Sequence, residues 1–176
     1  MTARINAALA AVLVLVLVLL AVVLIGGSRV LPWTTRAERT TDAYADVQVG
    51  ATRAVLAFLD VDFRQMDAKI KKVESVSTGD FGQQYAHTAV ELKAAAEQAH
   101  AVSHGDVRYV GVNTVKGRTA KALVAADVVV SNTSTKANKA TKSCPHAGAR
   151  CDSYRFQVTL TRVGDTWKMS NLAGVS

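Results

Sequence analysis

Hydrophobic and polar residues follow three different patterns along this chain, and the first is an unbroken apolar run. Residues 7–25 consist only of Ala, Val, Leu and Ile. A helix of this length spans about 30 Å, the thickness of a bilayer's hydrocarbon core, and satisfies its own backbone hydrogen bonds. The run predicts a transmembrane helix between a short cytoplasmic segment, residues 1–6, and a juxtamembrane linker, residues 26–34.

A cleaved signal peptide is the alternative interpretation of this run. Signal peptides have a shorter apolar core of ~7–15 residues, followed by a cleavage site of the small-x-small type. The core here is longer, and the sequence IGGS at residues 25–28 matches Ala-x-Ala poorly. We therefore expect an uncleaved anchor and a single-pass protein of the cell membrane.

Apolar residues recur every three or four positions in the next three segments, which is typical of amphipathic helices. The first predicted helix starts at residue 34 or 35 and ends with Leu59. The second follows directly, and the third begins at the capping residue Asp80 and is closed by Gly105. The apolar faces comprise Tyr44, Val47, Ala51, Val55 and Phe58 in the first helix, Phe63, Met66, Ile70 and Val73 in the second, and Phe81, Tyr85, Thr88 or Ala89, Leu92, Ala96 and Ala99 in the third.

After Gly105 the period changes to two, which predicts β-strands rich in β-branched residues. The predicted strands comprise residues 107–115, 119–130 and 154–161, and a last segment that follows the turn at Gly164-Asp165 and ends near Leu172. Three helices before four strands predict one α+β domain over residues 35–176, in which the helices pack on one face of a curved antiparallel sheet.

A long polar connection over residues 131–152 separates the second and third strands, and it holds the only two cysteines of the chain. Cys144 and Cys151 are seven positions apart, a spacing that suits a disulfide, whereas His146 alone adds too few ligands for a metal site. A bond closing this ring stabilises the loop by about 2–3 kcal/mol and persists outside the cytoplasm. We expect an extracytoplasmic domain, and disorder over residues 131–142.

The charge of the chain does not point to a nucleic acid partner. The formal net charge of +7 arises from 21 basic and 14 acidic residues, and its excess is diffuse. The densest basic stretch, which contains Lys136, Lys139, Lys142 and Arg150, has no interleaved aromatic residues and is interpreted as solvated surface.

Three short motifs accompany this layout: LDVDF at residues 59–63, STGDF at 77–81 and GDTWKM at 164–169. With the N-terminal anchor, their order and spacing resemble the bacterial Mce-associated (mammalian cell entry-associated) membrane proteins. This resemblance implies a cone-shaped extracytoplasmic domain, similar to nuclear transport factor 2 and the SnoaL-like proteins. It also implies an accessory or scaffolding role among envelope proteins of an Mce-type lipid or sterol import system, without catalytic residues.

Two further interpretations remain open. The same anchor and cone layout suits a bitopic scaffold of a type IV secretion or conjugation machine. It also suits an anchored SnoaL-like enzyme or lipid-binding protein, and cones of that kind place a carboxylate and a tyrosine inside. Asp127 is the candidate carboxylate here, with Tyr109 or Tyr154 as the hydrogen-bond donor of a possible pocket.

The remaining candidates for chemistry are weak. His100 and His104 lie four apart but lack the Glu of a zincin motif, and His87 is interpreted as a partly exposed residue. The chain has no glycine-rich phosphate loop with a Lys and no nucleophile elbow. We therefore expect a non-enzymatic protein without a metal or cofactor, whose partners are the bilayer, other envelope proteins and a lipid or sterol ligand.

Overall fold

The computed structural model describes residues 36–175, and their side chains from residue 41 onward. The predicted transmembrane run over residues 7–25 lies outside the described residues, as do the segments 1–6 and 26–34. None of the helices within the described part is long and apolar enough to cross a bilayer. The contacts discussed below belong to one compact unit that begins at Asp42.

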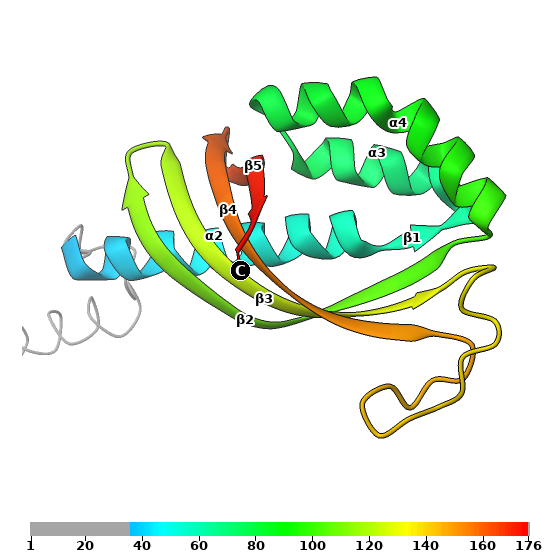
Figure 1. The fold of residues 1–176 in the computed structure, drawn as a ribbon. Coiled ribbons are helices and arrows are strands. Elements are labelled where there is room, and N and C mark those ends of the chain that lie inside the picture. Colours follow the sequence, from blue (N-terminus) through cyan, green and yellow to red (C-terminus); the bar gives the residue numbers. More distant parts are fainter. Residues whose placement is uncertain (1–35, 176) are drawn as a thin grey trace, which may run out of the picture. The chain divides into compact units, whose positions relative to one another are not determined.

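Three α-helices form one layer of this unit (Figure 1). They are α2 (Arg36–Leu59), α3 (Met66–Val76) and α4 (Gly79–Ala99), and a 3-10 turn, η2 (Phe63–Gln65), leads into α3. The predicted apolar faces of the first two are confirmed for Val47, Ala51 and Val55 of α2, which are fully buried, and for Met66, Ile70 and Val73 of α3. Tyr44, predicted for the face of α2, is exposed, and Phe63 lies in η2 rather than in α3.

The second layer is a five-stranded antiparallel sheet in the order β1-β2-β3-β4-β5. Its strands are β1 (Val61–Asp62), β2 (Val102–Lys116), β3 (Thr119–Ser131), β4 (Arg150–Val163) and β5 (Thr166–Gly174). The prediction of four strands is wrong, because it lacks the short strand β1. This strand pairs with Val102 and Ser103 at the start of β2. Two residues are too few to show a period in the sequence.

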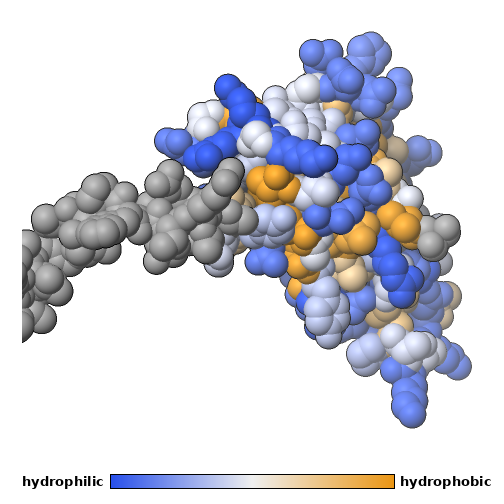
Figure 2. Space-filling model, turned by 90° about the vertical axis from the view of Figure 1, so that its left-hand side faces the viewer, coloured by the Kyte–Doolittle hydropathy of each residue, from blue (hydrophilic) through white to orange (hydrophobic). Residues whose placement is uncertain are grey.

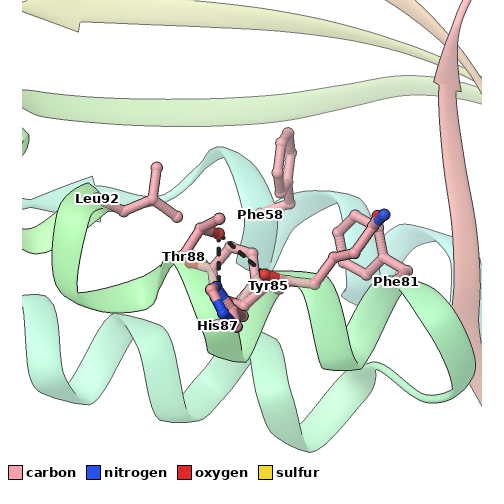
Figure 3. A pocket seen from close by; sticks show the side chains of 7 residues that line it. Phe58, Phe81, Tyr85, His87, Thr88 and Leu92 are labelled. Carbon is pink, nitrogen blue, oxygen red and sulfur yellow. Dashed lines mark hydrogen bonds between the residues drawn. The ribbon is translucent and has the colours of Figure 1, made fainter.

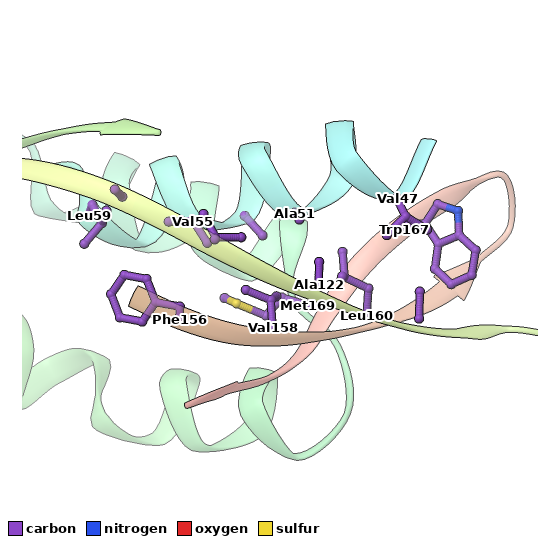
Figure 4. Close-up of a cluster of buried hydrophobic side chains, with 14 of the residues drawn as sticks. Val47, Ala51, Val55, Leu59, Ala122, Phe156, Val158, Leu160, Trp167 and Met169 are labelled. Carbon is purple, nitrogen blue, oxygen red and sulfur yellow. The ribbon is translucent and has the colours of Figure 1, made fainter. Parts of the chain in front are cut away.

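The main core lies between α2 and the concave face of the sheet (Figures 1 and 4). Alternation along β3 and β4 turns every second side chain inward, as predicted for Phe156, Val158 and Leu160. The inward residues of β3 include small alanines, which let α2 approach the strands closely. The buried members of this cluster are Val47, Ala51, Ala54, Val55, Leu59, Ala120, Ala122, Val124, Ala126, Val128, Phe156, Val158, Leu160, Trp167 and Met169.

Both ends of α4 differ from the prediction. The helix is capped by Thr78 rather than Asp80, and it ends at Ala99, where His100 adopts a left-handed backbone conformation with a φ of 48°. Gly105 does not close the helix but lies in β2, where an added Cβ would meet the Cβ of Leu59 at 2.7 Å. The glycine is therefore required by close packing of α2 on β2 rather than by a helix cap.

The connection between β3 and β4 is held by hydrogen bonds, so the expectation of disorder over residues 131–142 is wrong. The hydroxyl of Thr135, which is buried, donates to the carbonyl of Gly148 at 2.8 Å, and the Asn138 amide donates to Ala149 at 3.1 Å. Short polar side chains thus replace the missing apolar contacts. The predicted disulfide between Cys144 and Cys151 is present, with the two Cα atoms 5.3 Å apart.

Candidate functional site

An open groove of about 430 Å³ lies between the end of α2 and one face of α4 (Figure 3). It exists because α4 buries little of its predicted apolar stripe. Among the residues of α4, only Ala96 is buried, while Leu92 remains 41% exposed. The lining residues are Phe58, Phe81, Gln84, Tyr85, His87, Thr88 and Leu92.

Aromatic rings of α2 and α4 form one wall of this groove, and ring contacts connect them to two rings of β4 outside it. Phe58 of α2 contacts Phe81 of α4 edge to face at 6.1 Å between centroids, and Phe81 stacks on Tyr85 at 6.1 Å. On the other side, Phe58 meets Phe156 of β4 at 6.4 Å, and Phe156 stacks on Tyr154 at 5.7 Å. Such ring pairs fix one another's orientation, so the wall is preformed.

The polar side chains that line the groove are those of Gln84, Tyr85, His87 and Thr88. The Thr88 hydroxyl donates to backbone carbonyls of its own helix, those of Gln84 and Tyr85, at 3.0 and 3.3 Å (Figure 3). No group within residues 41–175 hydrogen-bonds the Tyr85 hydroxyl. Burial, aided by the charge of Glu74, raises the pKa of Tyr85, which keeps that hydroxyl protonated and able to donate.

The residues predicted for a pocket do not assemble inside the cone. Asp127 alternates with the buried Ala126 and Val128, so its side chain lies on the opposite, outer face of the sheet, and Tyr109 pairs in register with Ala125 on that same face. Tyr154 pairs with Ala126 and lies on the inner face. The proposed carboxylate and this tyrosine are therefore separated by the sheet itself.

Asp127 is engaged in a surface network instead. Its carboxylate accepts hydrogen bonds from Ser153 Oγ at 2.7 Å and from Arg108 Nε at 2.8 Å, and Arg108 also pairs with Asp106 at 2.9 Å. The Ser153 hydroxyl and the Arg108 guanidinium hold the pKa of Asp127 below its ordinary value. A carboxylate held ionised in this way is a poor general base.

Beside this network, the outer face of the sheet carries exposed apolar side chains. Tyr109 is 79% exposed and Leu123 is 49% exposed, and both line a shallow hollow of about 250 Å³. Figure 2 shows another side of the molecule, that of the β2–β3 turn, where separate apolar patches interrupt a hydrophilic surface. The outer face thus offers an apolar surface next to a charged network.

In the described part of the chain, the fold does not bring the histidines together as metal ligands, and the basic stretch stays on the surface. His100 packs against the Phe63 ring at 5.0 Å, while His104 is exposed on β2 and His87 is exposed on α4. Within the described residues, no group of three or more His, Cys, Asp or Glu side chains could hold a metal ion. Lys136, Lys139 and Lys142 are exposed on the β3–β4 connection.

Sequence reasoning missed the groove because it assigned its residues to the core. Phe58, Phe81, Tyr85 and Leu92 fit an apolar helical stripe, and such a stripe normally packs against another element. The one available signal was Thr88 in the middle of the α4 stripe. A polar residue at that place indicates a face that is not fully buried.

Comparisons with known proteins show a family match and a similar protein of known sequence. A family model described as "Uncharacterized protein Rv1363c/MT1408-like" matches residues 6–176. The similar protein "Uncharacterized protein Rv1363c" of Mycobacterium tuberculosis (strain ATCC 25618 / H37Rv) is 28% identical over 162 residues. That alignment covers 86% of this chain and 56% of the relative, so the chain spans a little more than half of the relative's length.

Two solved structures with a similar arrangement of elements are proteins of bacterial secretion systems. An IcmL-like type IV secretion system protein of Legionella pneumophila is 13% identical, with a TM-score of 0.56, and the match covers 75% of this chain and 93% of that chain. CagV, a VirB8 homolog of the type IV secretion system of Helicobacter pylori, is 8% identical, with a TM-score of 0.55 and coverage of 75% and 98%. At these identities the likeness shows the fold alone, which is nuclear transport factor 2-like.

Proposed function

The chain belongs to the Rv1363c/MT1408-like family, and from that premise we propose that it is a non-enzymatic, membrane-anchored accessory or scaffolding protein of the bacterial cell envelope. The domain lies outside the cytoplasm, where it binds other envelope proteins. Its assembly is an Mce-type lipid or sterol import system, as the sequence motifs suggest. The membrane anchor is the apolar run over residues 7–25.

One observation supports binding rather than catalysis above all others. The carboxylate that the sequence offers for base chemistry, Asp127, forms its hydrogen bonds with Arg108 and Ser153 on the outer face, whereas the groove is on the inner side. The described residues that line the groove include no carboxylate. A pocket with apolar walls and few polar groups is suited to holding a ligand rather than transforming it.

A second candidate is a scaffold component of a type IV secretion or conjugation machine. It is favoured by the fold shared with the IcmL-like protein and with CagV, which are both type IV secretion system proteins. The two candidates predict the same topology and different partners. Partner identity therefore decides between them.

The deciding experiment is quantitative mass spectrometry of proteins that copurify with the tagged full chain, expressed from its own locus and solubilised from native membranes. Enrichment of Mce-type and permease subunits is the expected result, and enrichment of a secretion ATPase and its partners would select the second candidate. Recovery of neither kind of assembly would contradict both. A paired Tyr109→Ser and Leu123→Ser variant should lose the partners, because these side chains are exposed on the outer face.

The matched control for that variant is Val90→Ser, since Val90 is 78% exposed on α4. The Val90→Ser variant should copurify with the same partners, in the same amounts, as the unmodified chain. Topology is tested separately: protease added to intact spheroplasts should degrade the domain, and its protection would place the domain in the cytoplasm and remove the proposal.

A further inference from the structure

The groove between α2 and α4 carries an inference that does not depend on the identity of any partner protein. We propose that it binds a neutral amphiphile, with an apolar body along the aromatic wall and a single hydroxyl or carbonyl oxygen at Tyr85. This ligand site stands whether or not the chain belongs to a lipid import assembly.

The shape of α4 provides the first step. Phe81, Tyr85, Thr88 and Leu92 are spaced by four, three and four residues, so they share one helical face. That face lines the groove and is only partly covered by the rest of the domain, so its largest aliphatic side chain, Leu92, stays 41% exposed. A stripe of this kind lowers its free energy when an apolar molecule covers it.

The size and preformation of the groove indicate a small molecule. Its volume of about 430 Å³ falls in the range of pockets that hold small ligands. The Phe58 ring contacts Phe81 on one side and Phe156 on the other, so the groove needs no rearrangement to present its aromatic wall. A preformed wall reduces the conformational entropy lost on binding.

The polar groups define the head group of the ligand. Thr88 already donates to its own helix, whereas the Tyr85 hydroxyl has no hydrogen-bond partner in the described part of the chain. Gln84 and His87 add two further polar side chains to the lining. Among the described residues, no Lys or Arg lines the groove to pair with an anionic head group, and no Asp or Glu lines it to pair with a cationic one. An ionised ligand would lose hydration without compensation, which favours a neutral alcohol, ketone or ester.

The test uses the full chain in lipid nanodiscs and a long-chain alcohol that carries a photoreactive diazirine and an alkyne. After illumination and tryptic digestion, the label should map to the peptide 73–93, which contains the α4 face, and excess unlabelled alcohol should suppress it. Label confined to other peptides would overturn the proposal. The matched carboxylic acid should label this peptide about tenfold less, and equal labelling would refute the neutral head group.

Variants locate the site and the hydrogen bond. Leu92→Trp should fill the groove and reduce labelling of this peptide about tenfold, whereas Val90→Trp, at the 78% exposed position on another face of α4, should leave it unchanged. Tyr85→Phe keeps the ring and should weaken alcohol binding about three- to tenfold, with no effect on a matched alkane probe. If Leu92→Trp has a native circular dichroism spectrum and unchanged labelling, the ligand does not bind in the groove. If Tyr85→Phe binds the alcohol as tightly as the unmodified chain does, the proposed hydrogen bond to Tyr85 is wrong.

Discussion

Replacing Gly50 by Ala should destabilise this domain, although the same change stabilises most helices. Gly50 lies inside α2, where Ala is intrinsically favoured over Gly by about 0.5–1 kcal/mol. An added Cβ, however, would lie 2.7 Å from the Cβ and 3.0 Å from the carbonyl oxygen of Trp167, and 3.3 Å from Cδ2 of Leu160. Two of these three atoms belong to the neighbouring strand β5 close to its backbone, so they cannot give way by a rotamer change.

The magnitude follows from these opposing effects. Inserting a methyl group into a packed core costs about 1–3 kcal/mol, and both Trp167 and Leu160 are buried. After subtraction of the helical preference, the free energy of unfolding should fall by about 1 kcal/mol, and by at most about 2.5 kcal/mol. With a urea m-value of about 1–3 kcal/mol/M, the unfolding midpoint should fall by roughly 0.5–1 M. Urea titration of the full chain followed by circular dichroism measures this shift.

The matched control is Gly82→Ala in α4. There the nearest atoms to a new Cβ are those of Ser77 at 3.6 Å, which is ordinary van der Waals contact. The helical preference then acts alone, and the free energy of unfolding should rise by about 0.5–1 kcal/mol. If Gly50→Ala raised the unfolding midpoint as Gly82→Ala is expected to, this result would contradict the close contact between α2 and β5 at Gly50.

Three further predictions concern other parts of the molecule. Reduction of the disulfide between Cys144 and Cys151 should lower the free energy of unfolding by about 2–3 kcal/mol, measured by urea titration with and without reductant, and an unchanged midpoint would mean that the bond does not form. Asp127, whose pKa is lowered in the folded state, contributes stability above its ordinary pKa of 3.8 that is lost as the pH falls through the lower folded value. Asp127→Asn should therefore flatten the acid side of the stability profile, and an unaltered profile would count against the surface network. Leu160→Ala in the core should cost about 2–5 kcal/mol in thermal unfolding, while Leu123→Ala on the outer face should cost under about 0.5 kcal/mol, and equal costs would contradict the assigned faces.

The helices and long strands could be predicted because their apolar residues repeat with a clear period. Val47, Ala51 and Val55 mark one face of α2, and Phe156 and Val158 mark one face of β4, and the structure buries all of them, Phe156 to 9% exposure. Periodicity reports which residues share a face. It does so wherever an element is long enough to show several repeats.

Features that depend on one or two residues could not be predicted in the same way. The strand β1 has only two residues and exists because the end of α2 returns the chain to the edge of β2. The sequence predicts that Gly105 ends the third helix, whereas the helix ends at Ala99 and His100 adopts the left-handed conformation although it is not a glycine. The local propensity of Gly105 suits both a helix cap and a strand in close contact, and packing against Leu59 decides between them.

The sequence also could not predict which face of β3 carries Asp127. From residue 122 to 130, β3 is apolar on both faces, with Asp127 as its single polar residue, because Leu123, Ala125 and Val129 alternate with inward Ala126 and other small residues. Alternation then groups Asp127 with its neighbours correctly but does not say which group faces the helices. A strand with two apolar faces is expected where both sides are covered. In the described part of the chain, helices cover only the inner face, and Leu123 stays half exposed on the other. The apolar residues that hid the orientation of Asp127 are therefore the same ones that the proposed partner proteins would contact on the outer face.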